Sequence, residues 1–361
     1  MSQERTRLDW VDAAKGISII LVVMMHSAYG VGEATGAAGY LHYVIGWATP
    51  FRMPEFFLIS GLFLGQVIGR SWARYADRRV IHYLYFYAVW AVLQIAFKVG
   101  LGAGDPVTAL SYVAWAAIEP YGVLWFIYML AVFSLVTKLL YELRAPHWGV
   151  LALGALMQAS PVHTGSGIID EFAAYYVYFY GGYALAPHIF RIVAWAQANV
   201  EVAVGALVAY ALINAALVFS GGFEMTPVRA EMGLAALPGL HLALAFAGSI
   251  ALCVFAALLM RFKWMDWLRW LGAHSIVVYL SFSIPMAATR VLLLRLGLEN
   301  TSILSTVVLL VAIVSPLVLY GIIQWTGRGR FLFERPAWAH LPGTPGSRSY
   351  QPAPAAVTPA E

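Results

Sequence analysis

Two ionisable residues interrupt the first apolar segment of the chain, and their spacing suits proton chemistry. The stretch "DAAKGISIILVVMMHS" runs from Asp12 to Ser27, with Lys15 near its start and His26 near its end. Three turns of an α-helix take about 11 residues, so the two side chains would project from nearly the same face, about 16 Å apart along the axis. A histidine at membrane depth usually faces the protein interior or a wet cavity, where its imidazole can exchange a proton near neutral pH. The competing interpretation is a structural histidine that only hydrogen-bonds a neighbouring helix.

Arg52 and Glu55 lie in a second apolar segment, "FRMPEFFLISGLFLG". An arginine at this depth is costly unless a partner or a cavity receives it. The two residues are three apart, so in a helix they would share one face and could form an ion pair. Arg52 could also stabilise negative charge that develops on a substrate oxygen. Pro50 and Pro54 interrupt the segment, and the backbone groups freed there need protein or a wet cavity around them.

A cluster of arginines follows this segment and comprises Arg70, Arg74, Arg78 and Arg79. Arginine side chains bind phosphate groups well. Together with Lys15, the cluster could therefore form a positively charged entrance that binds an anionic ligand. The alternative is that these charges only hold the loop on the cytoplasmic side of a membrane.

The composition requires that membrane helices position these residues. Of 361 residues, 61% are hydrophobic and only 11% are charged, whereas soluble domains have roughly 25% charged residues. The net charge of +4 comes from basic residues scattered between apolar runs, which does not suggest nucleic-acid binding. The single cysteine, Cys253, can form no intrachain disulfide.

The apolar runs predict an all-α, polytopic membrane protein with about ten transmembrane helices, each near the length that a roughly 30 Å hydrocarbon core requires. The expected spans are 14–30, 41–68, 80–100, 121–141, 147–162, 172–190, 199–220, 235–260, 271–290 and 302–325.

The distribution of Lys and Arg predicts the orientation. With ten crossings and the N-terminus inside, only five of the 22 basic residues lie outside the cytoplasmic segments, namely Arg52, Lys98, Arg229, Arg290 and Arg295. This asymmetry predicts that both termini are cytoplasmic. We expect residues 1–335 to form the membrane domain, and the Pro- and Ala-rich residues 336–361 to form a disordered cytoplasmic tail.

Four short motifs follow one another along the chain. They are Asp12, Lys15, Gly16 and His26, then "FRMPEFFLISG" at 51–61, "LWFIYML" at 124–130 and "LGAHSIVVYL" at 271–280. This ordered set resembles the acyltransferase 3 family of integral membrane acyltransferases, in its short form without an appended soluble domain. The third span departs from the common family pattern R-x-x-R, because "RRVIHY" places His82 after Arg79.

The resemblance implies transfer of an acyl group, with acetyl expected, from cytoplasmic acyl-CoA to a hydroxyl of an extracytoplasmic glycan or similar acceptor. It implies that His26 is the catalytic histidine and Lys15 its basic partner. We then expect Lys15, Arg78 and Arg79 to bind the donor phosphates and Arg52 to stabilise the oxyanion. His26 would either deprotonate the acceptor hydroxyl or carry the acyl group transiently. No metal is expected, and the expected location is the bacterial inner membrane, in contact with membrane lipid.

Two other classes of function stay open at this point. A proton-coupled transporter or flippase could use His26, Arg52 and Glu55, although transporters often show internal repeats and none is evident in this sequence. A structural membrane protein that has lost catalysis is the third class, and the presence of both Lys15 and His26 argues against it. The sequence specifies neither the acceptor nor the oligomeric state.

Overall fold

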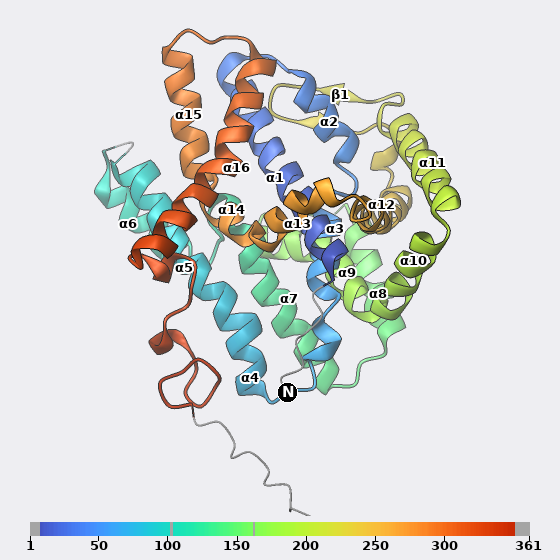
Figure 1. Ribbon diagram of the computed structural model, residues 1–361, viewed down its shortest axis with the longest axis horizontal. Coiled ribbons are helices and arrows are strands. Elements are labelled where there is room, and N and C mark those ends of the chain that lie inside the picture. Colours follow the sequence, from blue (N-terminus) through green and yellow to red (C-terminus); the bar gives the residue numbers. More distant parts are fainter. Residues whose placement is uncertain (1–7, 102–103, 162, 351–361) are drawn as a thin grey trace, which may run out of the picture.

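The computed structural model describes residues 8–101, 104–161 and 163–350 as a bundle of helices with one short β-hairpin (Figure 1). Helical residues make up 77% of the structure, which confirms the all-α prediction. The α-helices are α1 (Asp9–Thr35), α2 (Tyr40–Ala48), α3 (Arg52–Gly61), α4 (Trp72–Ala76), α5 (His82–Ile95), α6 (Pro106–Trp115), α7 (Trp125–Glu142), α8 (His147–Ala159), α9 (Gly167–Ala184), α10 (Ala186–Ala198), α11 (Val200–Val218), α12 (Pro238–Leu259), α13 (Asp266–Ala273), α14 (Ser275–Ser281), α15 (Ser283–Arg295) and α16 (Thr301–Thr326). The strands are β1 (Glu224–Met225) and β2 (Ala230–Glu231), and the short 3₁₀- or π-helical segments are η1 (Leu64–Gln66), η2 (Asp77–Ile81), η3 (Ala96–Leu101), η4 (Gly122–Leu124), η5 (Leu234–Ala236), η6 (Lys263–Met265), η7 (Arg330–Leu332) and η8 (Ala337–Ala339).

Six helical stretches in the described part of the chain are long and apolar enough to cross a membrane. The helices α14 and α15 form a seventh candidate if they are taken as one span, which bends by 55° between them. These seven coincide with seven of the expected spans, so the chain is an integral membrane protein. The six are Asp9–Thr35, Trp72–Leu101, Gly122–Glu142, Val200–Val218, Pro238–Leu259 and Thr301–Thr326.

The other three expected spans are helical but do not confirm the predicted total of ten. The segment 41–68 is divided into α2, α3 and η1, with Pro50 in the turn between the two α-helices. Helix α8 has only 13 residues, and a helix of that length reaches about 20 Å. Helix α9 has 18 residues but includes five tyrosines and two acidic residues, which lower its hydropathy.

Helix α1 lies at the centre of the bundle, where it contacts α13, α16, α12, α2 and α3. Its crossing with α13 depends on two glycines, Gly16 and Gly272, that face each other. A Cβ atom on Gly272 would clash with the backbone carbonyl oxygen of Asp12, and one on Gly16 would clash with that of Leu268. Small residues allow two membrane helices to approach this closely, and here they fix the position of the helix that carries Lys15 and His26.

We expect Gly272→Ala to destabilise the protein more than an ordinary alanine substitution in a helix. The added methyl group meets rigid backbone rather than a flexible side chain, and overpacking of this kind costs about 1–3 kcal/mol or more. The measurement is the midpoint of thermal unfolding in detergent. Gly205→Ala is the matched control, because a Cβ atom there meets open space, and an equal midpoint for the two variants would contradict the close α1–α13 crossing.

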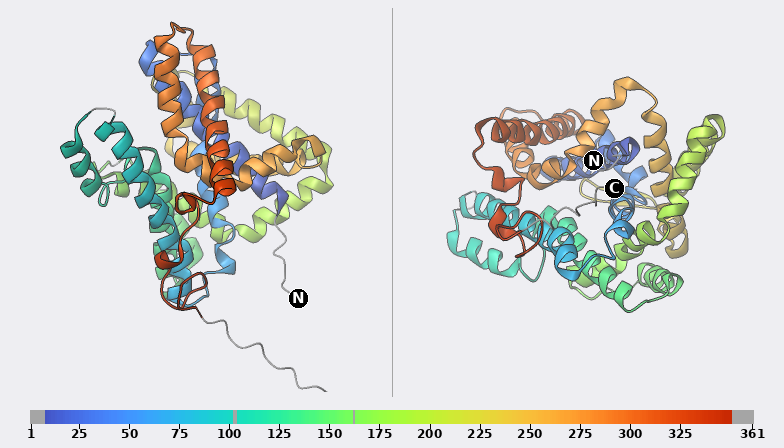
Figure 2. Two further views of the ribbon diagram at one scale, coloured as in Figure 1. Left: turned by 60° about the vertical axis from the view of Figure 1, so that its left-hand side comes forward. Right: turned by 60° about the horizontal axis from the view of Figure 1, so that its bottom comes forward.

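The C-terminal segment, defined here as residues 330–350, runs back along α4 and α5 after α16 ends (Figures 1 and 2). It contains η7 and η8, and its Thr344 side chain is fully buried. This differs from the disordered tail expected from residue 336, since residues 336–350 are folded here by hydrogen bonds to Asp77. Residues 351–361, the rest of the expected tail, lie outside the described residues.

Candidate active site

His26 lies two thirds of the way along α1, on the same uninterrupted helix as Lys15. Its ring packs against the ring of Phe282, with 5.4 Å between centroids, at the point where α14 meets α15. No hydrogen bond joins the ring to a residue that the structure describes, and neither ring nitrogen is among the fully enclosed polar atoms. The imidazole nitrogens therefore have no hydrogen-bond partner among the described residues, which disfavours a purely structural hydrogen-bonding role.

Arg52 begins α3, immediately after the turn that contains Pro50. The hydroxyl of Tyr29, one helical turn after His26 on α1, is its side-chain partner. The Nε and Nη1 atoms of Arg52 are buried and have no partner among the described residues. Buried donors without partners are rare because they cost free energy, so these two N–H groups are candidates to bind a substrate oxygen.

The predicted ion pair between Arg52 and Glu55 is wrong, since no contact joins the two side chains in the structure. Glu55 is fully buried and accepts a hydrogen bond from the Ser18 hydroxyl of α1, while its Oε1 atom has no partner among the described residues. Although the two residues are near neighbours on α3, Arg52 is held by Tyr29 and Glu55 by Ser18, eleven residues earlier on α1. Glu55 therefore joins α3 to α1 and does not neutralise Arg52.

Two further cations lie near His26 that the sequence analysis did not assign to the site. Arg52 and Lys98 of η3 both act on His26 electrostatically. Arg290 of α15 lies close to Lys98 and donates a hydrogen bond to the Gly30 carbonyl oxygen of α1 at 2.6 Å. A signal for them was present, since Lys98 and Arg290 are among the five basic residues that do not follow the cytoplasmic bias.

The β-hairpin packs against α2 and against the C-terminal end of α1 (Figure 1). The His42 Nε2 atom is 3.0 Å from the Pro227 carbonyl oxygen in the turn of the hairpin, and the Ala230 backbone lies close to Tyr29. The hairpin therefore lies beside the Tyr29 end of the site.

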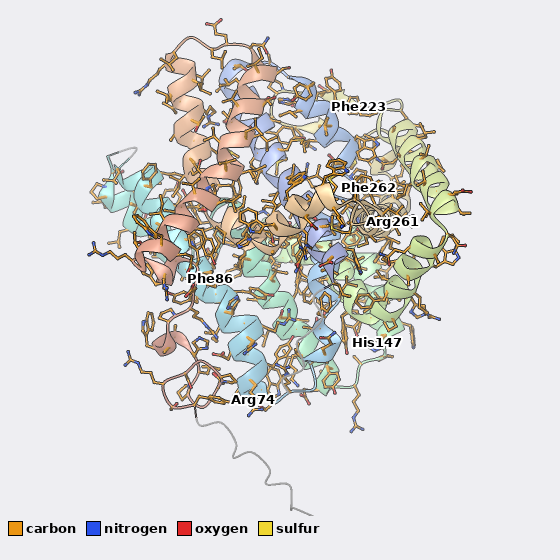
Figure 3. All side chains as sticks on the ribbon, in the orientation of Figure 1. Arg74, Phe86, His147, Phe223, Arg261 and Phe262 are labelled. Atoms are coloured by element: carbon orange, nitrogen blue, oxygen red, sulfur yellow. The ribbon has the colours of Figure 1, made fainter. Side chains whose placement is uncertain are left out.

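Arg78 and Arg79 line a cavity of about 490 Å³ near the opposite end of the bundle. Figure 3 labels two of its lining residues, Arg74 near the end of the bundle and Phe86 further along α5. Lys15 is not among the residues lining this cavity, and its Nζ atom is 3.6 Å from Asp12 on its own helix. The full lining is Val67, Arg70, Arg74, Tyr75, Arg78, Arg79, His82, Phe86, Phe333, Glu334, Arg335, His340 and Pro345.

Lys138 positions the loop that carries Arg70. Its Nζ atom is buried and donates to the carbonyl oxygens of Ile68 and Arg70 at 2.7 and 3.1 Å. It also forms an ion pair with Glu142 at 2.5 Å. The positive-inside pattern counted Lys138 as a topological charge, but the structure shows that it holds one edge of the arginine cavity in place.

An aromatic core lies between the arginine cavity and His26. Phe86, which lines the cavity, and Phe282, which packs on His26, belong to one buried cluster. Phe56 and Phe126 stack in the same cluster with 4.6 Å between ring centroids. The structure therefore has an arginine-lined cavity and the His26 and Arg52 side chains at opposite ends of one buried apolar cluster.

Comparison with known proteins identifies the family. The acyltransferase 3 family model, described as an acyltransferase domain, matches residues 8–321. No curated protein and no solved structure matches the chain significantly. The match covers α1 to α15 and most of α16, including His26, Arg52, Arg78 and Arg79, and it ends before the C-terminal segment.

Proposed function

The chain belongs to the acyltransferase 3 family. We therefore propose that it is a membrane acyltransferase that moves an acyl group from acyl-CoA to a hydroxyl of an extracytoplasmic glycan or similar acceptor. The acyl group that we propose is acetyl. The observation that carries the proposal is that Arg52, whose Nε and Nη1 atoms have no partner among the described residues, lies near His26, whose ring makes no hydrogen bond to a described residue. The positive-inside rule supports a cytoplasmic location for the arginine cavity. The membrane would be the bacterial inner membrane.

In the proposed reaction His26 is the general base. A ring nitrogen takes the proton of the acceptor hydroxyl, and the oxygen attacks the thioester carbonyl carbon. The Arg52 N–H groups stabilise the negative charge that forms on the carbonyl oxygen. The carbon–sulfur bond then breaks, and the proton passes from the imidazolium to the coenzyme A thiolate.

Lys98 and Arg290 have a supporting role in this proposal. Lys98 lies near His26, and Arg290 donates a hydrogen bond to the Gly30 carbonyl oxygen one turn further along α1. Their positive charges would favour the oxyanion during reaction, because electrostatic effects are larger in a site shielded from water. Tyr29, the side-chain partner of Arg52, would help to orient its guanidinium group.

The experiment that tests the function measures release of free coenzyme A by the purified full-length protein in lipid nanodiscs. Acetyl-CoA is the donor, and soluble and lipid-linked glycans are the acceptors. We expect coenzyme A release that depends on acceptor, with the labelled acetyl group recovered on a hydroxyl of the acceptor. Proton-coupled uptake into proteoliposomes without any acyl transfer would favour the transporter alternative.

We predict that Arg78→Glu weakens donor binding. Reversing one charge in the arginine cavity should raise KM for acetyl-CoA about tenfold or more, since charge-assisted contacts to phosphate are strong, while kcat at saturating donor changes little. The affinity of the unmodified protein for coenzyme A should also fall with added salt. The measurement is donor titration of initial rates at two ionic strengths.

Arg261→Glu is the matched control for this prediction. Arg261 is exposed and lies away from Arg74 and its cavity (Figure 3). An Arg78→Glu protein that inserts poorly but binds coenzyme A with unchanged affinity would show that the arginines only anchor the topology.

A further inference from the structure

The C-terminal segment forms one wall of the arginine cavity. Phe333, Glu334, Arg335, His340 and Pro345 line the cavity opposite the arginines of α4 and η2. A second cavity of about 610 Å³ is lined by Arg70, Ser71, Arg74, Arg78 and Pro345. The C-terminal segment therefore borders both of the cavities that the arginines line.

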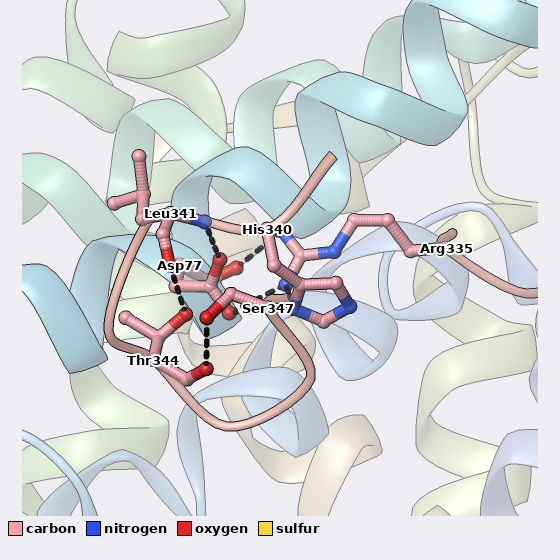
Figure 4. A network of polar contacts seen from close by, with 6 residues as sticks. All are labelled: Asp77, Arg335, His340, Leu341, Thr344 and Ser347. Carbon is pink, nitrogen blue, oxygen red and sulfur yellow. Dashed lines mark hydrogen bonds and ion pairs between the residues drawn. The ribbon is translucent and has the colours of Figure 1, made fainter. Parts of the chain in front are cut away.

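A buried junction at Asp77 holds this wall in place (Figure 4). The Asp77 side chain is fully buried and that of Arg335 is 3% exposed, with 2.6 Å between Arg335 Nη2 and Asp77 Oδ2. His340 Nδ1 lies 3.1 Å from the same carboxylate oxygen, and the Leu341 amide donates to its Oδ1 atom at 2.8 Å. Arg335 Nη1 also donates to the Asp77 carbonyl oxygen at 2.8 Å. A partly formed junction would leave a buried charge unpaired. These contacts therefore fix the position of the C-terminal segment against the arginine cavity.

The junction also determines the charge that an anionic ligand meets. Asp77 immediately precedes Arg78 and Arg79, so an unneutralised carboxylate there would oppose phosphate binding. Arg335 neutralises it from the C-terminal segment. The carboxylate of Glu334 accepts a hydrogen bond from Gln324 at 2.7 Å. The arginines of α4 and η2 then supply the net positive charge of the cavity.

We propose that the C-terminal segment is part of the donor site. It covers the arginines, neutralises Asp77 and thereby slows release of the phosphate-bearing half of the donor. This inference rests on the proposed function, since it takes acyl-CoA as the ligand of the arginine cavity. The family match ends at residue 321, so this wall comes from a part of the chain beyond the matched residues.

The test measures binding and dissociation of coenzyme A with the full-length protein in nanodiscs. Arg335→Gln should weaken affinity about tenfold, mainly through faster dissociation, because most affinity differences within one site appear in the off-rate. His340→Ala, a milder change at the same junction, should accelerate dissociation to a smaller extent. Turnover of S-acetylpantetheine, a donor without phosphates, should stay at the level of the unmodified protein in both variants.

Arg330→Gln is the matched control, because Arg330 is exposed on the same segment and does not line the cavity. Adding Asp77→Asn to Arg335→Gln should recover part of the lost affinity, since the opposing carboxylate is removed. Unchanged coenzyme A dissociation in Arg335→Gln and His340→Ala would overturn the inference, as would an equal loss of S-acetylpantetheine turnover. Should Arg78→Glu also leave coenzyme A affinity unchanged, the donor site itself would fail, which is a separate result.

Discussion

Replacing His26 by alanine should abolish acyl transfer while the protein still folds and inserts. Loss of a general base lowers turnover by about 10²–10⁴-fold, and His26 is the residue that we assign to this role. The side chain makes no hydrogen bond to a described residue, and its ring packs on Phe282, so its removal leaves no described polar group without its partner. The measurement is turnover per folded molecule, with folding scored by monodispersity in detergent.

Chemical rescue separates a catalytic role for His26 from a structural one. Added imidazole can occupy the space left in His26→Ala, and we expect it to restore part of the acyl transfer in a concentration-dependent way. His188→Ala is the control, because His188 is exposed on α10. If His26→Ala keeps more than a few per cent of turnover, or if imidazole has no effect on a well-folded variant, the assignment of His26 as the base is wrong.

The most reliable expectations concerned helices with continuous apolar runs. Helices α1, α7, α12 and α16 appear close to the expected bounds, because a run of about 20 apolar residues has no stable alternative to a helix in lipid. The break near Pro50 was also visible, since proline interrupts the backbone hydrogen bonds of a helix. These features depend on local sequence alone.

Expectations that depended on tertiary contacts were less successful. The Pro- and Ala-rich composition after residue 335 predicts disorder, whereas a buried ion pair to Asp77, 258 residues away in sequence from Arg335, folds residues 336–350. No local pattern shows such a contact. For the same reason the sequence suggested an Arg52–Glu55 pair, although α3 aims the two side chains at different positions on α1.

Part of the site could be predicted from the sequence, because its ionisable residues lie within apolar segments where such residues are rare. His26 and Arg52 were identified because ionisable residues at membrane depth are expensive. Lys98 and Arg290 were noted only as basic residues on the wrong side of the topology, and the fold then places them near His26. Tyr29 gave no signal, because a tyrosine near the end of a span usually marks the membrane interface.

Arg52→Lys should lower turnover strongly while leaving insertion intact. Lysine keeps the positive charge beside Tyr29 but loses the planar arrangement of several N–H donors. The two N–H groups of Arg52 without partners are the ones we assign to the oxyanion, and loss of one oxyanion donor costs about 10²–10³-fold in kcat. Donor affinity should change little, because Arg52 does not line the arginine cavity.

Glu55→Gln is the matched comparison, since it changes a buried ionisable residue on the same turn of α3. Glutamine keeps the size of the side chain and an oxygen that can accept from Ser18, and no cation is left unpaired because Arg52 and Glu55 do not contact each other. We therefore expect Glu55→Gln to fold and to turn over within about threefold of the unmodified protein, a difference below 1 kcal/mol. Measuring kcat and KM for both variants tests the assignment directly. A fully active Arg52→Lys together with a well-folded, inactive Glu55→Gln would reverse the two roles and place Glu55 with His26 in the chemistry.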